Sequence, residues 1–221
     1  MKKIVISLGG SLINPGKINY KFLRGFKATI RKFFRYKIVI VTGGGKIARD
    51  YIEALSDKNE KIRSLIGIKA TKLNAMLVSN FLDNEIVVPD SLNDVKKLLK
   101  RRNLVVCGAL GYRDKMTSDG TAADVARSLK ADLLINMTNV KGLYDKDPGK
   151  FKNAKLISEI GFSNFLKIVN KIKYKPGQHF VLDQVAAGII AKHKIKTVIL
   201  KGHDELDRCL NQKKFIGTVI C

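Results

Sequence analysis

Short apolar runs of strand length alternate with segments of helical period, and this alternation constrains the fold more than any other feature of the sequence. Strands that are separated by helices pair in parallel, and helices cover both faces of such a sheet. The pattern therefore predicts an α/β fold with a parallel sheet, whose ligands gather at the carboxyl edge of the strands. The expected strands lie at residues 4–6, 38–41, 86–88, 104–107, 133–137 and 197–200, and helical patterns at 20–34 and 47–55.

Polar residues indicate where two further helices begin. Ser91, with Asp94 three residues later, precedes one apolar helical pattern, and Asp183 precedes another at residues 185–191. Side chains of these types accept hydrogen bonds from the first free amides of a helix, so both are predicted to act as caps alone. Because there is no internal repeat and no Pro/Ser-rich linker, residues 1–221 are predicted to form one domain, with any division near residues 120–131.

The chain is strongly basic, with 42 Lys and Arg against 19 Asp and Glu, a net charge of +23. Such an excess attracts nucleotides, phosphates or nucleic acid. The lysines are spread along the whole chain, so solvated basic faces are the simpler interpretation, also for the basic run at residues 96–102. Nucleic-acid binding stays an alternative, but no recognition motif or cluster of aromatic stacking residues accompanies the basic run, so nucleic acid is not an expected partner.

Cysteine usage and the first residues of the chain bear on location. The cysteines, Cys107, Cys209 and Cys221, are odd in number and widely spaced, which argues against a disulfide framework and favours a reducing cytoplasm. The apolar residues before Ser7 are too few for a signal segment or a membrane span, so no membrane association is expected. The three histidines are not at metal-ligand spacing, and no metal held by protein ligands is expected.

Two glycine-rich loops follow the first two predicted strands. The first comprises residues 7–11, and the second is Gly43, Gly44 and Gly45, followed by Lys46 and Arg49 on a predicted helix. Glycine lets backbone N–H groups approach an anion, and a helix N-terminus adds positive potential. The second loop has neither dinucleotide-fingerprint nor P-loop spacing, so it predicts a phosphate site of another kind, whereas a loop like the first is, taken alone, more often a tight turn than a phosphate site.

The third loop, residues 108–118, ends in hydroxyl residues at the start of an Ala-rich helix. Thr117 and Ser118 are candidates for binding phosphate at that helix N-terminus. Asp119 is either the cap of the helix or a carboxylate that orients catalytic groups and a magnesium-bound phosphate. The sequence alone leaves both interpretations open.

The fourth loop, residues 138–148, is rich in polar side chains. Thr138 and Asn139 can contact phosphate or base edges, Tyr144 offers a flat ring to a purine, and Asp147 can accept from ribose hydroxyls or base amines. Turn chemistry by itself also accounts for Gly142 and for Asp147 followed by proline. The loop is therefore a nucleotide site or a set of turns.

The four loops, in this order, resemble the amino-acid-kinase superfamily and, within it, the archaeal-type uridylate kinases. The resemblance covers nearly the whole chain and is carried by residues 43–49, 66–76, 129–134, 138–148 and 217–218. It implies a three-layer αβα sandwich with a mainly parallel central sheet, in which residues about 1–120 bind the phosphoryl acceptor and about 121–221 bind Mg-ATP. The implied activity is ATP-dependent phosphorylation of UMP to UDP in pyrimidine nucleotide biosynthesis, by a homo-oligomer that is commonly a hexamer.

The resemblance also implies roles for individual residues. Lys46 and Asp119 are the implied catalytic residues, and Mg²⁺ is carried by nucleotide phosphates. The implied ATP-binding residues are Ser7, Leu8, Gly9, Gly10, Ser11, Gly45, Arg49, Thr138, Asn139, Tyr144 and Asp147. The implied UMP-binding residues are Gly44, Ser64, Leu110, Gly111, Tyr112, Arg113, Asp114, Lys115, Met116, Thr117 and Ser118.

The sequence departs from the pattern of similar kinases at three places. Many members have a lysine at the position of Ser7, where it bridges the donor and acceptor phosphates, and an acidic residue that holds the acceptor's sugar aligns with Ser64. The usual Pro-Gly-His-like loop is replaced by residues 111–115, in which Arg113 and Lys115 either grip a phosphate or are solvated. A kinase of the same fold that acts on another small phosphate or carboxylate is therefore the alternative hypothesis.

Overall fold

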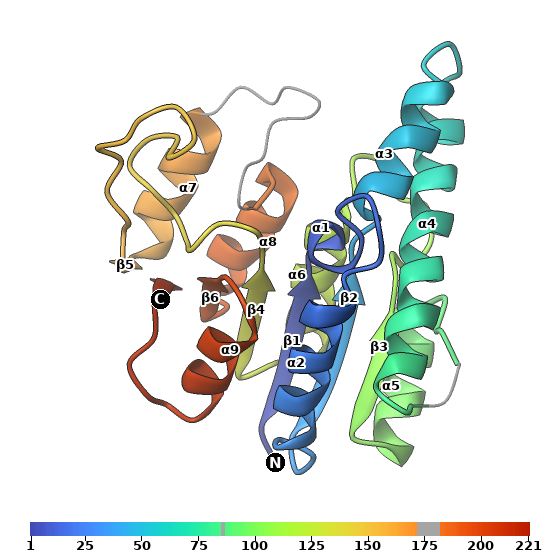
Figure 1. Ribbon diagram of the computed structural model, residues 1–221, viewed down its shortest axis with the longest axis horizontal. Coiled ribbons are helices and arrows are strands. Elements are labelled where there is room, and N and C mark those ends of the chain that lie inside the picture. The colour runs from blue at the N-terminus through green and yellow to red at the C-terminus, as the bar shows by residue number, and fades with distance from the viewer. Residues whose placement is uncertain (85–86, 172–181) are drawn as a thin grey trace.

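A computed structural model describes residues 1–84, 87–171 and 182–221, which form a seven-stranded sheet flanked by helices (Figure 1). The strands are β1 (Lys3–Leu8), β2 (Lys37–Thr42), β3 (Leu104–Cys107), β4 (Leu133–Met137), β5 (Glu159–Ile160), β6 (Thr197–Leu200) and β7 (Gly217–Ile220). The helices are α1 (Gly10–Ile13), α2 (Tyr20–Arg31), α3 (Gly45–Ala54), α4 (Glu60–Phe81), α5 (Leu92–Arg101), α6 (Ser118–Leu129), α7 (Phe162–Lys171), α8 (Gln184–His193) and α9 (His203–Leu210).

The strand order is β3-β2-β1-β4-β6-β7-β5, and the first five strands in this order are parallel. Strand β7 is antiparallel to β6 and parallel to β5. From β1 the chain proceeds outward through β2 to β3, whereas the strands that follow β4 in the chain, β5, β6 and β7, all lie on the other side of β4. The direction of winding therefore switches between β1 and β4, which is where ligands bind in open parallel sheets.

Two hydrophobic clusters lie on the two faces of the sheet. The helices α5, α6, α7 and α8 cover the face that contains Val5 and Val39, and α2, α4 and α9 cover the face that contains Ile6 and Ile40. Successive residues of a strand point to opposite faces, so Ser7 shares the face of Val5 and points toward the α6 side. The predicted αβα arrangement is confirmed.

Most of the predicted elements are confirmed, and the differences have physical causes. The strand expected at residues 86–88 is wrong at Val87 and Val88, which lie in no strand, while Ile86 lies outside the described residues. The two-residue edge strand β5 and its neighbour β7 were not predicted. Neither was the 22-residue helix α4 (Glu60–Phe81), because apolar residues occur on both its buried and its exposed face and obscure the helical period.

Candidate active site

The loops that follow the parallel strands meet at one edge of the sheet, as the sequence predicted (Figure 1). Backbone hydrogen bonds join them where the strands end: Gly9 N donates to Met137 O at 2.9 Å, and Gly43 N donates to Leu8 O at 2.9 Å. The first, second and fourth loops are thereby held side by side around the switch point between β1 and β4.

The first two loops touch each other through their glycines. A Cβ added to Gly10 would lie 2.6 Å from Gly45 Cα, and one added to Gly43 would lie 2.7 Å from Gly10 N. Gly45 also has a φ of +69°, which side-chain-bearing residues rarely adopt. Close approach of two backbones therefore requires these glycines, while the amides of Ser11 and Gly44 have no hydrogen-bond partner among the described residues and are free to bind an anion.

Helix α4 holds the second and third loops in place. Asn74 Nδ2 donates to Gly43 O at 2.7 Å and to Gly44 O at 3.1 Å. Thr71 Oγ1 accepts from Ala109 N at 2.8 Å, and Thr71 O accepts from Thr42 Oγ1 at 2.8 Å. Sequence reasoning missed the roles of Asn74 and Thr71, although both lie in the segment 66–76 that carries the family resemblance.

Ser64 lies on the part of α4 that runs beside the third loop. Residues seven apart share one face of a helix, so Ser64 faces the same way as Thr71, which contacts the loop at Ala109. One turn before Ser64, Lys61 Nζ lies 5.9 Å from the centre of the Tyr112 ring. Ser64 is therefore placed between two contacts of α4 with the segment 108–118.

The N-terminus of α6 brings a carboxylate to the switch point. Asp119 Oδ1 accepts a 2.6 Å hydrogen bond from Ser7 Oγ, and Ser7 is a buried residue near the end of β1. Burial and then the nearby charge of Asp183 raise the pKa of Asp119 from 3.8 to about 7, although the Ser7 hydrogen bond opposes the rise. A carboxyl group that changes its charge near neutral pH thus lies beside the phosphate loops.

Thr117, and not Asp119, is the cap of α6. Its Oγ1 accepts from Gly120 N at 3.0 Å, so the interpretation of Asp119 as the helix cap is wrong. Thr117 Oγ1 also donates to Asp183 Oδ2. Asp183 caps α8 as predicted, accepting from Ala186 N at 2.9 Å, and in addition it joins the N-termini of α6 and α8.

The side chain of Arg113 is 42% exposed to solvent, and it also forms an ion pair within the protein. Its Nη1 lies 2.8 Å from Oδ2 of Asp124, whose side chain is only 6% exposed, and Arg127 Nη2 lies 2.7 Å from the other oxygen. Burial raises the pKa of Asp124, but hydrogen bonds from Arg127 and Arg113 outweigh it and hold the pKa below its usual range. Arg113 therefore anchors the third loop to α6.

The other candidate cations are on the surface. Lys46 and Arg49 are exposed on the first turns of α3, and Lys46 forms an ion pair with Asp50 one turn along. Lys115 is exposed and has a φ of +56°. In the rest of the third loop, Leu110 is buried, Met116 and Ser118 are half-buried, and Gly111, Tyr112 and Asp114 are exposed.

The fourth loop combines a local turn with contacts to distant segments, since Leu143 N donates to Thr218 Oγ1 at 2.8 Å. Asp147 Oδ1 accepts from Gly149 N at 2.9 Å, which is the turn chemistry considered for this residue. Tyr144 is half-buried and forms an isolated bridge with Leu156. Thr138 Oγ1 and Asn139 Oδ1 are 3.3 Å apart, directly beyond the end of β4.

Family membership follows from this fold and from sequence comparison. A model of the amino acid kinase family matches residues 2–201. The chain belongs to the amino acid kinase family. A uridylate kinase from Methanococcus aeolicus is 35% identical, over 99% of this chain and 99% of that protein. A uridylate kinase from Pyrococcus abyssi is 37% identical over 92% of each.

Solved structures of family members agree with the architecture. A crystal structure of uridylate kinase from Archaeoglobus fulgidus aligns over 100% of both chains, with a TM-score of 0.87 and 33% identity. A UMP kinase from Ureaplasma parvum, at 22% identity and a TM-score of 0.81, shows the same fold. The amino acid kinase fold predicted for this chain is thereby confirmed.

Two features of the described residues concern membranes and metal sites. No helix in them is long and apolar enough to span a bilayer. Within the same residues, no three His, Cys, Asp or Glu side chains are grouped as a metal site would need, and His179 lies outside them.

Proposed function

We propose that this chain transfers the terminal phosphoryl group of ATP to UMP, giving UDP and ADP, and serves pyrimidine nucleotide synthesis. The observation that carries the proposal is geometric: free loop amides, Ser7 and Asp119 meet at the switch point of the sheet. The similar proteins described above are uridylate kinases, which agrees with this geometry. Such an edge can bind two phosphate groups in line, which is the main requirement of phosphoryl transfer.

The two substrates are proposed to bind on opposite sides of this switch point. UMP would lie between Gly44, α4 near Ser64 and the third loop, whose contacts with α4 form a continuous wall. ATP would place its adenosine against the fourth loop, where Tyr144 and Asp147 offer a ring and a carboxylate. Residues about 1–120 would then be the acceptor half and about 121–221 the donor half.

The residues at the edge have distinct proposed tasks. The amides of Ser11 and Gly44 would bind phosphate oxygens, and Lys46 and Arg49 would add positive charge from α3 in place of a lysine at Ser7. Asp119, fixed by Ser7, would orient the groups around the transferred phosphoryl. Bound Mg²⁺ supplies neutralisation of the phosphate charge.

The direct test is a product assay. Purified protein with ATP, UMP and Mg²⁺ is expected to form UDP and ADP in equal amounts, measured by chromatography. Absence of UDP at saturating substrates, with a protein that melts cooperatively, would contradict the proposal.

A different acceptor is the second candidate, and the structure of the acceptor side favours testing it. Ser64 has no charge for a sugar hydroxyl, and Arg113 is engaged by Asp124. A panel of UMP, CMP, isopentenyl phosphate, acetylglutamate and aspartate separates the two candidates. A value of kcat/KM for UMP far above all others would eliminate this alternative.

We propose that the chain forms a homo-oligomer in the cytoplasm. The exposed face of α4 supports the assembly. This helix buries Ala75 and Val78 but leaves apolar side chains on its outer face: Ile62, Leu65, Leu73 and Met76 are 41%, 42%, 56% and 44% exposed. An uncovered apolar stripe of this kind marks an association surface. A solution mass measurement is expected to give a homo-oligomer, with a hexamer as the proposed state, and a monomer at micromolar concentration would contradict the proposal.

A further inference from the structure

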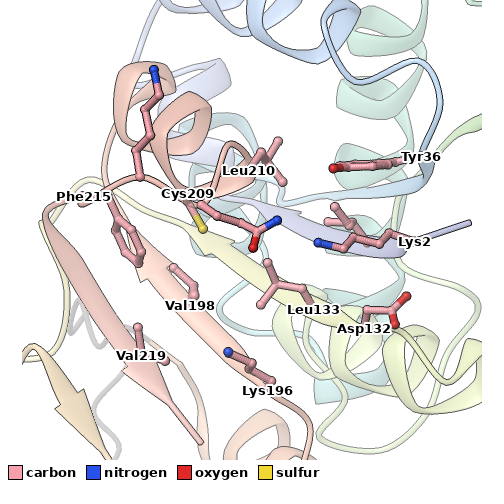
Figure 2. Close-up of a pocket in the computed structure, with 13 residues that line it drawn as sticks. Lys2, Tyr36, Asp132, Leu133, Lys196, Val198, Cys209, Leu210, Phe215 and Val219 are labelled. Atoms are coloured by element: carbon pink, nitrogen blue, oxygen red, sulfur yellow. The ribbon is translucent and has the colours of Figure 1, made fainter.

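A cavity of about 390 Å³ lies at the amino edge of the sheet, at the opposite end of the strands from the candidate active site (Figure 2). It is formed where β1, β4 and β6 begin, where β7 ends, and by the end of α9 with the residues after it. Its size is within the range of small-molecule sites. None of the residues assigned to phosphoryl transfer lines it.

The walls of this cavity suit a flat apolar body. Leu133 and Val198 form part of its apolar floor. Figure 2 shows the rings of Tyr36 and Phe215 on opposite sides of the space, and both residues are half-buried. Aromatic side chains placed in this way prefer another planar ring as a partner.

The charges around the cavity are mostly positive. Lys2, Lys196 and Lys213 line it, and among the described residues none of these three lysines has an ion-pair partner. Lys2 Nζ lies 6.0 Å from the centre of the Tyr36 ring. The acidic side chain in the lining, Asp132, accepts a 2.7 Å hydrogen bond from Lys3 N. The three lysines therefore outnumber the carboxylate of Asp132 in the lining and give a net positive rim over an apolar floor.

We propose that this cavity binds a planar aromatic anion. The ring system lies over the floor between Tyr36 and Phe215, and the anionic group lies within reach of Lys2 and Lys196. Charge complementarity selects an anion over a cation or a neutral ring of the same size. The site does not depend on the proposed kinase activity, because it is separated from the loops by the length of the strands.

The test uses the full chain and the fluorescent probe 8-anilinonaphthalene-1-sulfonate, an aromatic anion whose planar naphthalene ring carries a sulfonate. UMP and a non-hydrolysable ATP analogue are present at saturation, so that the candidate active site is filled. We expect saturable binding that the variant Lys2→Glu/Lys196→Glu weakens at least about tenfold. The variant Lys97→Glu/Lys214→Glu has the same net charge and changes exposed lysines outside the cavity, so it is expected to bind as the wild type does.

Cys209 gives a second readout, which does not require a charge substitution. It lines the cavity and is half-buried, and burial raises the pKa of its thiol to about 11, so its modification is slow and depends on access. In a Cys221→Ser background, which removes the exposed thiol, bound probe is expected to slow modification of Cys209. An unchanged rate shows that the ring does not enter the cavity and overturns the proposal.

Displacement of the probe identifies the source of the anion. Purine mononucleotides such as GMP and aromatic carboxylates such as salicylate share the proposed chemistry, and displacement by either class supports the site and names its ligand class. Failure of both classes to displace the probe, or equal probe binding by the two double variants, overturns the proposal. Formation of UDP by the same variants is measured as well, so that failure of the cavity proposal can be distinguished from failure of the proposed kinase function.

Discussion

The proposed acceptor side of the site, formed by α4 with the second and third loops, is built differently from the proposed donor side, formed by the fourth loop. On the acceptor side, Asn74 donates to Gly43 O and Thr71 Oγ1 accepts from Ala109 N, both about 30 or more residues away, and Arg113 is anchored to buried Asp124. On the donor side, the backbone of the fourth loop is also held by a distant residue, since Leu143 N donates to Thr218 Oγ1, but the side chain of Asp147 bonds only to Gly149, two residues along. The acceptor-side side chains thus hold distant segments together, whereas the Asp147 side chain holds a local turn, so its charge can be changed with little effect on the fold.

The largest expected effect comes from the contact between the two glycine loops. In Gly10→Ala the new Cβ would lie 2.6 Å from Gly45 Cα, so the loops must separate. We expect the free energy of unfolding to fall by about 3 kcal/mol and activity to fall by more than about a hundredfold, measured by denaturant titration and product assay.

Gly188→Ala is the matched control. A Cβ at Gly188 meets no atom within 4 Å, and the residue lies inside α8, so this change is expected to be neutral or to stabilise by up to about 1 kcal/mol. Equal stabilities of the two variants would show that the loops do not need their close approach.

The next largest effect is expected at Asp119, where the two sides meet. Asp119→Asn keeps the size of the side chain and an acceptor for Ser7 Oγ but removes the charge. We expect kcat to fall on the order of a hundredfold at pH 8, with both KM values changing little, because the charge orients reacting groups rather than either substrate alone. A large rise in only one KM would place Asp119 on that substrate's side.

The raised pKa of Asp119 also predicts a pH dependence of stability. Between pH 3.8 and about 7 the folded chain keeps a proton on Asp119 that the unfolded chain loses, so this group lowers stability as pH rises through that window. Asp119→Asn removes the effect. The difference in Tm, variant minus wild type, is expected to grow across this window and stay constant above it, and parallel curves would contradict the raised pKa.

Asp147→Asn tests the donor side alone. The amide oxygen of Asn can still accept from Gly149 N, so the turn and the Tm are expected to persist while the charge is lost. Loss of a charge-assisted hydrogen bond to ATP costs about 1.5 to 3 kcal/mol, or roughly a tenfold to hundredfold rise in KM for ATP. If only the KM for UMP rose, the donor and acceptor sides would be reversed.

The smallest effect is expected from Ser118→Ala, on the acceptor side. One hydroxyl donor is lost at the N-terminus of α6 while the backbone amides and the cap Thr117 remain, a change of about 1 kcal/mol or about fivefold in KM for UMP. Ser163→Ala, near the start of α7, is the control. A change in KM for ATP by Ser118→Ala would remove Ser118 from the acceptor side.

The parallel sheet and the edge at which its loops meet were predictable, because they follow from the alternation of strand and helix patterns and from the rule for parallel sheets. The first strand was predicted to end at residue 6, with Ser7 in the loop that follows, whereas β1 continues to Leu8 and places Ser7 on the face where it meets Asp119. The cap of α6 was less certain, because Thr117, Ser118 and Asp119 are consecutive residues that all cap helices.

The contacts that organise the proposed acceptor side could not be predicted from the sequence near each residue. Asn74 and Thr71 lie in the middle of a long helix, where their residue types carry no preference for a distant loop. Asp183 was predicted as a cap, but its contact with Thr117 joins residues 66 positions apart. The division into halves remains a prediction, as do the assignments of individual residues to ATP or UMP.

A crystal structure of the chain with UMP and a non-hydrolysable ATP analogue tests the central claim most directly. The account predicts UMP between α4 near Ser64 and the third loop, the adenosine against Tyr144 and Asp147, and the two phosphate chains meeting beside Ser7 and Asp119. Density for UMP against the fourth loop, or for adenosine against α4, would contradict the assignment of the two sides.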